Sequence, residues 1–184
     1  MLSKSCVKIL ITEVILVVVE IPKDEVELSI KRVEEFCTQH NWEVVYTNNK
    51  IDESRNTTIT LYRKRKPEIL FYIFLHEVGH VWLQQCDFTY QDKYPELCRE
   101  APRYATMTYK IARIQEEIEA WEVGKNLARS LGLRINQSKF EKLRAHCLTT
   151  YMNWAGKPRK NKMVNNSNVT LTTTTNNNTC SSQR

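Results

Sequence analysis

One apolar stretch dominates the sequence: PEILFYIFLHEVGHVWLQQ, at residues 67–85. Pro67 suits the first turn of a helix because its missing N–H has no partner there, and Glu68 lies where the helix dipole favours a negative charge. Apolar residues occur on almost every side of this helix rather than along one stripe, which is typical of a helix at the centre of a domain. The stretch therefore predicts a buried central helix.

This helix contains an HExxH motif, HEVGH at residues 76–80. A spacing of four residues puts both imidazoles on one face, one turn apart, where they can reach the same metal ion. Glu77 projects beside them and can take a proton from a water molecule without being a ligand itself. Burying these groups is costly without partners, and Zn²⁺ suits two imidazoles and a carboxylate. The motif predicts a zinc site with His76 and His80 as ligands; the alternative is two core histidines hydrogen-bonded to backbone.

A third ligand is expected from a helix predicted over about residues 108–130, which carries the acidic segment QEEIEAWE (115–122). Glu117 lies at the edge of the apolar stripe of this helix, in line with Ala120 and Gly124. Two small side chains beside a carboxylate would let the two helices approach closely, so that the short Glu117 side chain reaches the metal. Glu117 is therefore the preferred third ligand.

Three other glutamates on the same predicted helix are less suitable as the third ligand than Glu117. Glu116 and Glu119 point away from the apolar stripe, so we expect both to be solvated. Glu122 borders the opposite edge of the stripe and is the alternative third ligand. For any single glutamate on this helix, a solvated position is the structural alternative.

The remaining pattern predicts a mixture of helices and strands. A helix begins at Pro22-Lys23-Asp24 and ends at His40-Asn41, and a last helix covers about residues 137–154. Strands are predicted at residues 42–46 and 57–62, and residues 86–107 are interpreted as an irregular surface segment. The sequence therefore predicts a single α+β domain over residues 1–156.

The two ends of the chain differ in composition from this domain. The apolar run Val7–Val19 is broken by Thr12 and Glu13 and has no small-residue cleavage site, so a core strand is favoured over a signal peptide. No stretch is long and apolar enough to span a membrane. Residues 157–184, basic and then rich in Asn and Thr, bury too little apolar surface to fold and are expected to be disordered.

Charge and cysteine content bear on partners and compartment. The chain has 27 basic and 21 acidic residues, but no acidic residue follows Glu141, so the basic excess lies largely in the tail. Two short basic clusters, at residues 63–66 and 157–160, could be a nuclear signal or contact a nucleic acid, although solvated ends of elements are favoured. The six cysteines are scattered with no CxxC pair, which excludes a zinc ribbon and favours reduced thiols in an intracellular protein.

HEVGH followed by Glu117 in an E-x-x-A-W context resembles the gluzincin metallopeptidases, and within them small minimal zincins such as the ImmA/IrrE-like family. The resemblance covers about residues 57–130. It implies a small β-sheet packed against a buried active-site helix. It also implies a zinc-dependent endopeptidase with His76, His80 and Glu117 as ligands and Glu77 as catalytic base.

These patterns lead to two functional expectations. The first is an enzyme that hydrolyses peptide bonds of a protein or peptide substrate with Zn²⁺ and Glu77 as general base. The second is a regulatory or nucleic-acid-binding module in which zinc only supports the fold. An intact Glu77 favours the enzyme, because a structural site has no need for a base. Three side chains are candidates for stabilising the developing oxyanion, and the sequence selects none of them: Tyr104, Tyr109 and His146.

Overall fold

The computed structural model describes residues 20–99 and 106–157. Within these ranges five helices and three strands follow one another along the chain: α1 (Lys23–Gln39), β1 (Glu43–Thr47), β2 (Glu53–Arg55), β3 (Thr58–Tyr62), α2 (Pro67–Cys86), α3 (Tyr90–Lys93), α4 (Met107–Ser130) and α5 (Gln137–Gly156). This mixture confirms the α+β class predicted from the sequence. The predicted helices agree with α1, α2, α4 and α5 to within two residues at each end.

The described strands form one small sheet in the order β1-β3-β2. β1 runs parallel to β3 and β2 runs antiparallel to it, with Ser54 of β2 opposite Ile59 of β3. β2 was not predicted, since its sequence Glu-Ser-Arg has no apolar alternation. A two-residue turn joins it to β3, and Asn56 in that turn has a positive φ of 52°, a conformation that Asn tolerates better than most residues. In the order β1-β3-β2, β2 is one of the two edge strands of the described sheet.

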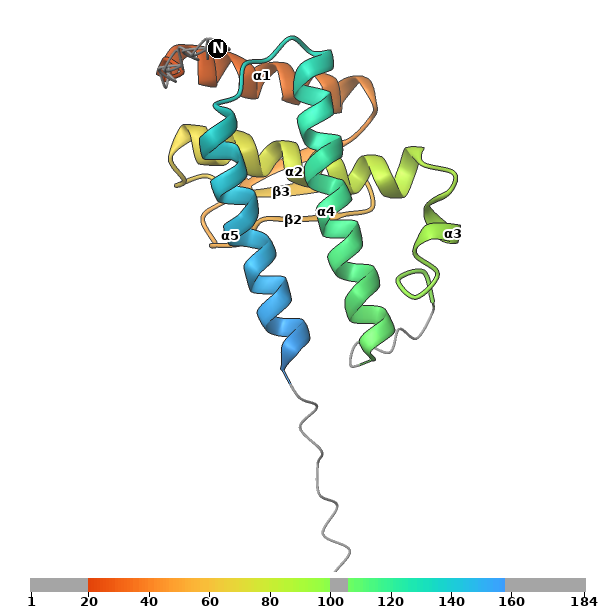
Figure 1. Cartoon of the computed structure of the whole chain (residues 1–184). Coiled ribbons are helices and arrows are strands. Elements are labelled where there is room, and N and C mark those ends of the chain that lie inside the picture. Colours follow the sequence, from red (N-terminus) through yellow and green to blue (C-terminus); the bar gives the residue numbers. More distant parts are fainter. Residues whose placement is uncertain (1–19, 100–105, 158–184) are drawn as a thin grey trace, which may run out of the picture.

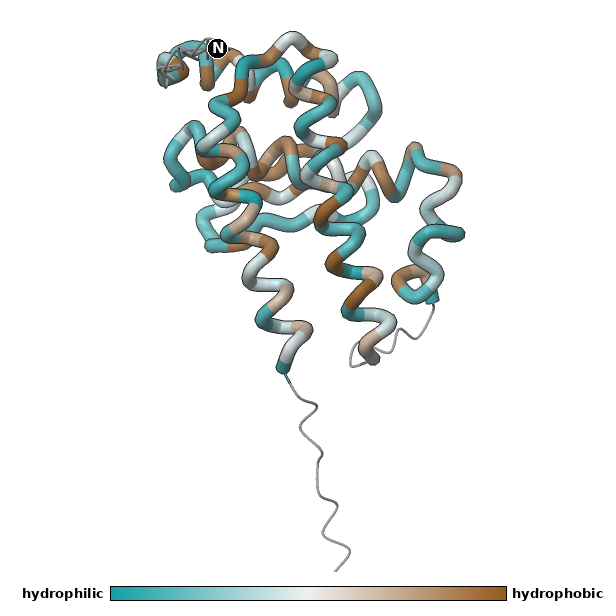
Figure 2. Tube along the Cα trace, in the orientation of Figure 1, coloured by the Kyte–Doolittle hydropathy of each residue, from teal (hydrophilic) through white to brown (hydrophobic). Residues whose placement is uncertain are grey.

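α2 is the central element, as predicted. It contacts α1 and the strands β2 and β3, and α4 crosses it (Figure 1). Every residue from Leu70 to Val81 is buried, and Figure 2 shows hydrophobic colouring along much of this helix. Its burial on all sides explains why its apolar residues do not form a single stripe.

α2 and α4 approach each other so closely that no side chain fits at two points between them. A Cβ atom added to Gly124 of α4 would lie 2.3 Å from the carbonyl oxygen of Leu75 in α2. On α4, the face toward α2 follows an i, i+4 row of buried residues that are small with one exception: Ala112, Glu116, Ala120, Gly124 and Ala128. The expected close approach of the two helices at Ala120 and Gly124 is therefore confirmed.

Other expectations fall partly outside the described ranges. The predicted N-terminal strand (14–19), residues 100–105 and the tail from 158 onward lie outside them. The predicted irregular segment after α2 contains the short helix α3. None of the described helices combines the length and apolar character needed to cross a membrane.

Candidate metal centre

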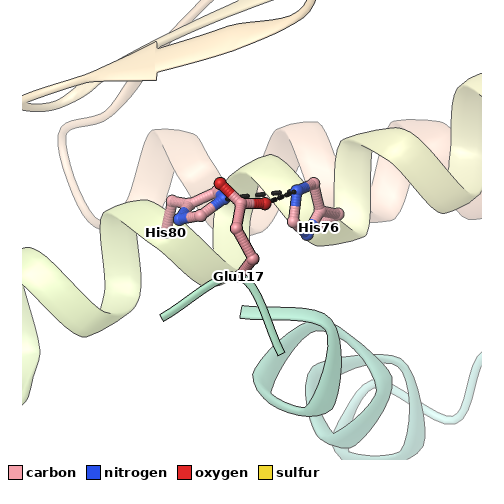
Figure 3. Close-up of side chains that lie close together, drawn as sticks. All are labelled: His76, His80 and Glu117. Atoms are coloured by element: carbon pink, nitrogen blue, oxygen red, sulfur yellow. Dashed lines mark hydrogen bonds and ion pairs between the residues drawn. The ribbon is translucent and has the colours of Figure 1, made fainter. Parts of the chain in front are cut away.

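The structure brings together the three predicted ligands from two helices. His76 and His80 extend from neighbouring turns of α2, and Glu117 reaches them from α4 (Figure 3). The Nε2 atoms of the two histidines are 3.2 Å apart, and Oε2 of Glu117 lies 3.3 Å from Nε2 of His76 and 3.4 Å from Nε2 of His80. All three residues are buried. The three atoms thus form a nearly equilateral triangle inside the protein.

The dimensions of this triangle fit a tetrahedral zinc ion. Two ligand atoms at the corners of such a site are about 3.3 Å apart, because zinc–nitrogen and zinc–oxygen bonds are about 2.0–2.1 Å long. The three observed separations are 3.2, 3.3 and 3.4 Å. Two imidazoles and one carboxylate are also the donor set of a common class of catalytic zinc sites, which leave one position open.

Protons cannot satisfy all three contacts at once. Each neutral imidazole has one N–H, and the Glu117 carboxylate can only accept. If both Nε2 atoms donate to Glu117, two N–H groups face each other across 3.2 Å. If one histidine donates its Nε2 proton to the other, the accepting Nε2 carries no proton and cannot donate to Glu117. A cation at the centre of the triangle satisfies the three groups together, so this donor set fits a metal ion.

The electrostatics of the cluster favour charged groups. Burial opposes ionisation of Glu117, but hydrogen bonds from His76 and His80 and their positive potential outweigh it, so the pKa of Glu117 lies well below its usual value. Burial likewise opposes protonation of His80, but the hydrogen bonds and negative charges of Glu116 and Glu117 outweigh it and raise the pKa of His80 to about 10. Both shifts favour the ionised forms of Glu117 and His80 inside the cluster.

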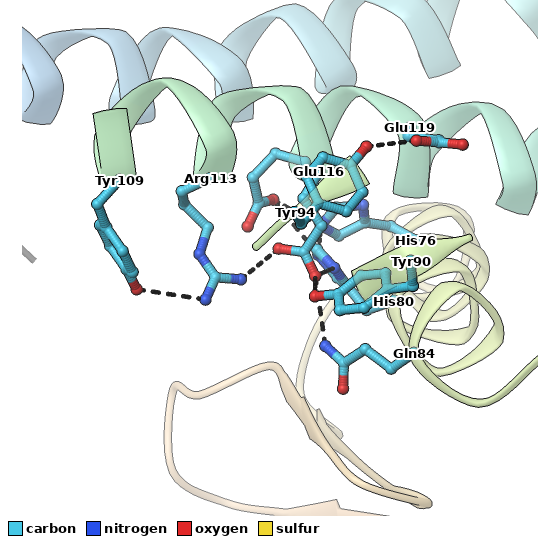
Figure 4. Close-up of polar contacts among 10 residues, drawn as sticks. His76, His80, Gln84, Tyr90, Tyr94, Tyr109, Arg113, Glu116 and Glu119 are labelled. Atoms are coloured by element: carbon cyan, nitrogen blue, oxygen red, sulfur yellow. Dashed lines mark hydrogen bonds and ion pairs between the residues drawn. The ribbon is translucent and has the colours of Figure 1, made fainter. Parts of the chain in front are cut away.

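Glu116 corrects one expectation from the sequence. It was expected to be solvated, but its side chain is fully buried. Its Oε1 lies 3.4 Å from Nδ1 of His80 and accepts hydrogen bonds from Tyr90 Oη at 2.9 Å and Gln84 Nε2 at 3.3 Å, while Arg113 forms an ion pair with Oε2 (Figure 4). A carboxylate at the second ring nitrogen of a metal-binding histidine fixes its tautomer and orientation. Glu116 is in the position to do this for His80.

The other glutamates of α4 lie away from the triangle. Glu119 accepts a hydrogen bond from Tyr94 (Figure 4) and another from Lys93, so it joins the segment after α2 to α4. Glu122, the alternative third ligand, pairs with Arg144 of α5 at 2.7 Å. Among the described residues, the group that can hold a metal ion contains Glu117 and not Glu122.

The predicted base, Glu77, lines the same cavity as the three ligands. This cavity has a volume of about 180 Å³ and is bordered on one side by β2. Burial raises the pKa of Glu77, while the neighbouring histidines and a hydrogen bond from Ser54 of β2 act in the opposite direction. A carboxylate with a raised pKa is a better proton acceptor than an ordinary one.

Tyr151 of α5 was missed at the sequence level. It lines the cavity with Glu77 and Glu117, and burial and the negative charge of Glu117 raise the pKa of its hydroxyl. Of the three oxyanion candidates considered from the sequence, His146 is exposed and does not line the cavity, and Tyr104 lies outside the described ranges. Tyr109 lines a neighbouring pocket. Tyr151 lies about four turns into α5. The sequence of this helix carries no motif, so only the packing of α5 against α4 reveals the place of Tyr151.

Comparisons with known proteins return no relatives. No protein-family model, curated protein or solved structure shows a significant match to this chain. The function of this chain is therefore inferred from the site itself.

Proposed function

We propose that this chain is a zinc-dependent endopeptidase, with His76, His80 and Glu117 as metal ligands and Glu77 as general base. The observation that carries the proposal is the placement of Glu77 in the same small cavity as three buried ligand atoms 3.2–3.4 Å apart. When bound, zinc lowers the pKa of a coordinated water and polarises a carbonyl group.

The residues of this chain supply the proton transfers. Glu77 accepts the proton of the attacking water and passes it to the amine that leaves when the peptide bond breaks. Burial raises the pKa of Glu77, which makes its carboxylate a stronger base for the first of these steps. Glu116 lies next to Nδ1 of the His80 ring and holds its orientation, and Ser54 lines the cavity together with Glu77.

The sheet supports a peptide substrate. β2 borders the cavity and is an edge strand of the described sheet. Edge strands offer backbone N–H and C=O groups that can pair with an extended chain. An extended peptide along β2 would pass Ser54 and bring its backbone next to Glu77.

Two of the four side chains in the basic cluster at residues 63–66 have partners within the protein, which argues against the nucleic-acid alternative. Arg65 forms an ion pair with the buried side chain of Asp52, and Arg63 hydrogen-bonds the backbone of Tyr46. These two side chains hold the loop before α2 in place. The alternative of a zinc-supported module without activity becomes one outcome of the test.

The test compares Glu77→Gln with a matched control, Glu122→Gln, in a proteome-derived peptide cleavage assay with zinc quantified in each protein. Glu77→Gln should bind one zinc per chain and lose at least about 100-fold in cleavage rate, as expected for removal of a general base. Glu122→Gln should retain both properties, because Glu122 pairs with Arg144 outside the cavity. Equal cleavage by Glu77→Gln and wild type would contradict the proposal, and zinc binding without cleavage by the wild type would favour the regulatory alternative.

A further inference from the structure

A second pocket adjoins the proposed catalytic cavity. It has a volume of about 470 Å³ and lies between α4 and α5; we call it the α4–α5 pocket. It shares Arg113, Glu117 and Tyr151 with the cavity that contains Glu77. A peptide held at the proposed metal centre would therefore have this pocket directly beside the bond to be cleaved.

The lining of the α4–α5 pocket is aromatic. Tyr109 from α4 and Tyr151 and Trp154 from α5 contribute three rings, and Thr150 lies beside them. The rings of Tyr109 and Trp154 are 6.4 Å apart and nearly perpendicular. Edge-to-face and offset arrangements of this kind are the ones that aromatic rings prefer, so a further ring can be received among them.

The size of the pocket suits a large side chain. Tyr109 and Glu117, which both line it, are eight residues apart on α4, a distance of about 12 Å along a helix. The volume of about 470 Å³ lies within the range of about 300–1,000 Å³ found for ligand pockets. An alanine or valine side chain would leave much of this space unfilled.

Lys110 contacts Trp154 and the C-terminal end of α5. Its Nζ donates hydrogen bonds to the carbonyl oxygens of Ala155 and Lys157, at 2.9 and 3.2 Å, and lies 5.6 Å from the ring centre of Trp154. These contacts join the C-terminal end of α5 to the first turns of α4. The indole is thereby held in place on the side of the pocket away from the metal centre.

The charged residues of the pocket wall already have partners. Glu117 contacts His76 and His80, so a basic side chain would have to compete with them for its carboxylate. An acidic side chain would have to compete with Glu116, which already pairs with Arg113. A neutral ring avoids both costs and can stack on the aromatic walls.

From this geometry we infer that the α4–α5 pocket binds a phenylalanine, tyrosine or tryptophan side chain of the substrate, next to the scissile bond. The inference rests on the proposed endopeptidase function and adds its substrate class: peptides and proteins with an aromatic residue at the cleavage site. Trp154 is its main specificity-determining residue.

A peptide-binding measurement tests the pocket assignment independently of catalysis. The zinc-loaded Glu77→Gln protein is titrated with a set of short blocked peptides that differ at one position: Phe, Leu, Ala, Glu or Lys. The Phe peptide should bind at least about tenfold more tightly than the Ala, Glu and Lys peptides, because its ring is buried between aromatic walls. In wild type, cleavage sites should show the same preference.

Two variants test whether the α4–α5 pocket is the site that binds the aromatic side chain. Trp154→Ala should reduce the Phe preference to less than about threefold, and Trp82→Ala is the matched control because Trp82, 36% exposed, packs on Phe36 and Trp42 far from the pocket lining. Thr150→Trp should abolish the preference by filling the pocket. Thr150 is exposed, so this variant should fold even if Trp154→Ala does not.

The outcomes separate the two proposals. If wild type cleaves peptides without an aromatic preference, or if Thr150→Trp keeps that preference, the pocket assignment is wrong and the endopeptidase stands. If Glu77→Gln binds the Phe peptide selectively but wild type cleaves no peptide, the pocket stands and the endopeptidase is wrong. Absence of both selective binding and cleavage overturns both.

Discussion

Gly79 of α2 lies against the backbone of Ala120 in α4, where a Cβ atom on Gly79 would be only 2.1 Å from the Ala120 carbonyl oxygen. This contact sets the distance between the two helices that carry the proposed metal ligands. Because Glu117 is three residues before Ala120, and His76 and His80 flank Gly79, the same close approach brings the carboxylate to both imidazoles. The residue between the ligands is therefore as much a part of the site as the ligands.

Gly79→Ala should separate the helices and weaken the site. The added methyl meets backbone atoms, which cannot move aside as a flexible side chain could, so unfolding free energy should fall by about 1–3 kcal/mol or more. Zinc affinity should fall with it. Gly156→Ala is the matched control because a Cβ there meets nothing within 4 Å. Denaturant unfolding and zinc titration of both variants check this, and equal behaviour would contradict the close contact.

Glu116→Gln should weaken zinc binding without removing a ligand. Glutamine keeps the size of the side chain but removes the charge that faces His80 Nδ1 and Arg113. A loss of about 10–100-fold in zinc affinity is expected, as for other residues that orient a metal-bound histidine. The control is Glu119→Gln, whose side chain contacts Lys93 and Tyr94 instead. Affinity unchanged from wild type in a zinc competition assay would show that Glu116 does not act on His80.

The sequence predicted much of this arrangement, and its failure at Glu116 has a physical cause. The HExxH motif, the central helix and the preference for Glu117 depend on spacing within single helices, which a sequence records directly. The face that α4 turns toward α2 depends on packing between helices. The apolar stripe in the sequence of α4 includes Ile111 and Ile114 and predicts that Glu116 points to solvent. In the structure, however, Ile111 is 48% exposed and Glu116 is buried.

A different pattern in the sequence marks the buried face of α4. Small residues recur every four positions on this helix, which allows backbones to approach closely. Glu116 occupies the one position in that row that is not small, and this interruption was the available sign that its carboxylate is buried. β2 and Tyr151 left no comparable sign, because edge pairing and the packing of α5 are tertiary effects.

Zinc binding should release a proton at mildly alkaline pH. Without metal, the pKa of His80 is raised from 6.5 to about 10, so the ring stays protonated well above neutral pH. Zinc binds the neutral ring and must displace this proton. Between about pH 7 and 9, apparent zinc affinity should therefore rise about tenfold per pH unit. Calorimetry at pH 8 in buffers of different ionisation enthalpy measures the released proton, and a value near zero would contradict the raised pKa.

Cys37 should resist alkylation in the native protein while Cys98 reacts. Cys37 is fully buried in the core, and burial raises the pKa of its thiol to about 12, so almost no thiolate is present at neutral pH. Cys98 is an exposed free thiol. Peptide mapping after a short iodoacetamide treatment should find label at Cys98 and not at Cys37, and both should react after unfolding. Early labelling of Cys37 would mean that α1 does not pack as described.

Anomalous scattering measured at the zinc edge, from crystals of the zinc-loaded protein, is the direct test of whether His76, His80 and Glu117 bind the ion. One strong peak is expected in each chain, about 2.0–2.2 Å from Nε2 of His76, Nε2 of His80 and a carboxylate oxygen of Glu117. The absence of a peak between these three residues, or a peak held by other side chains, would contradict it.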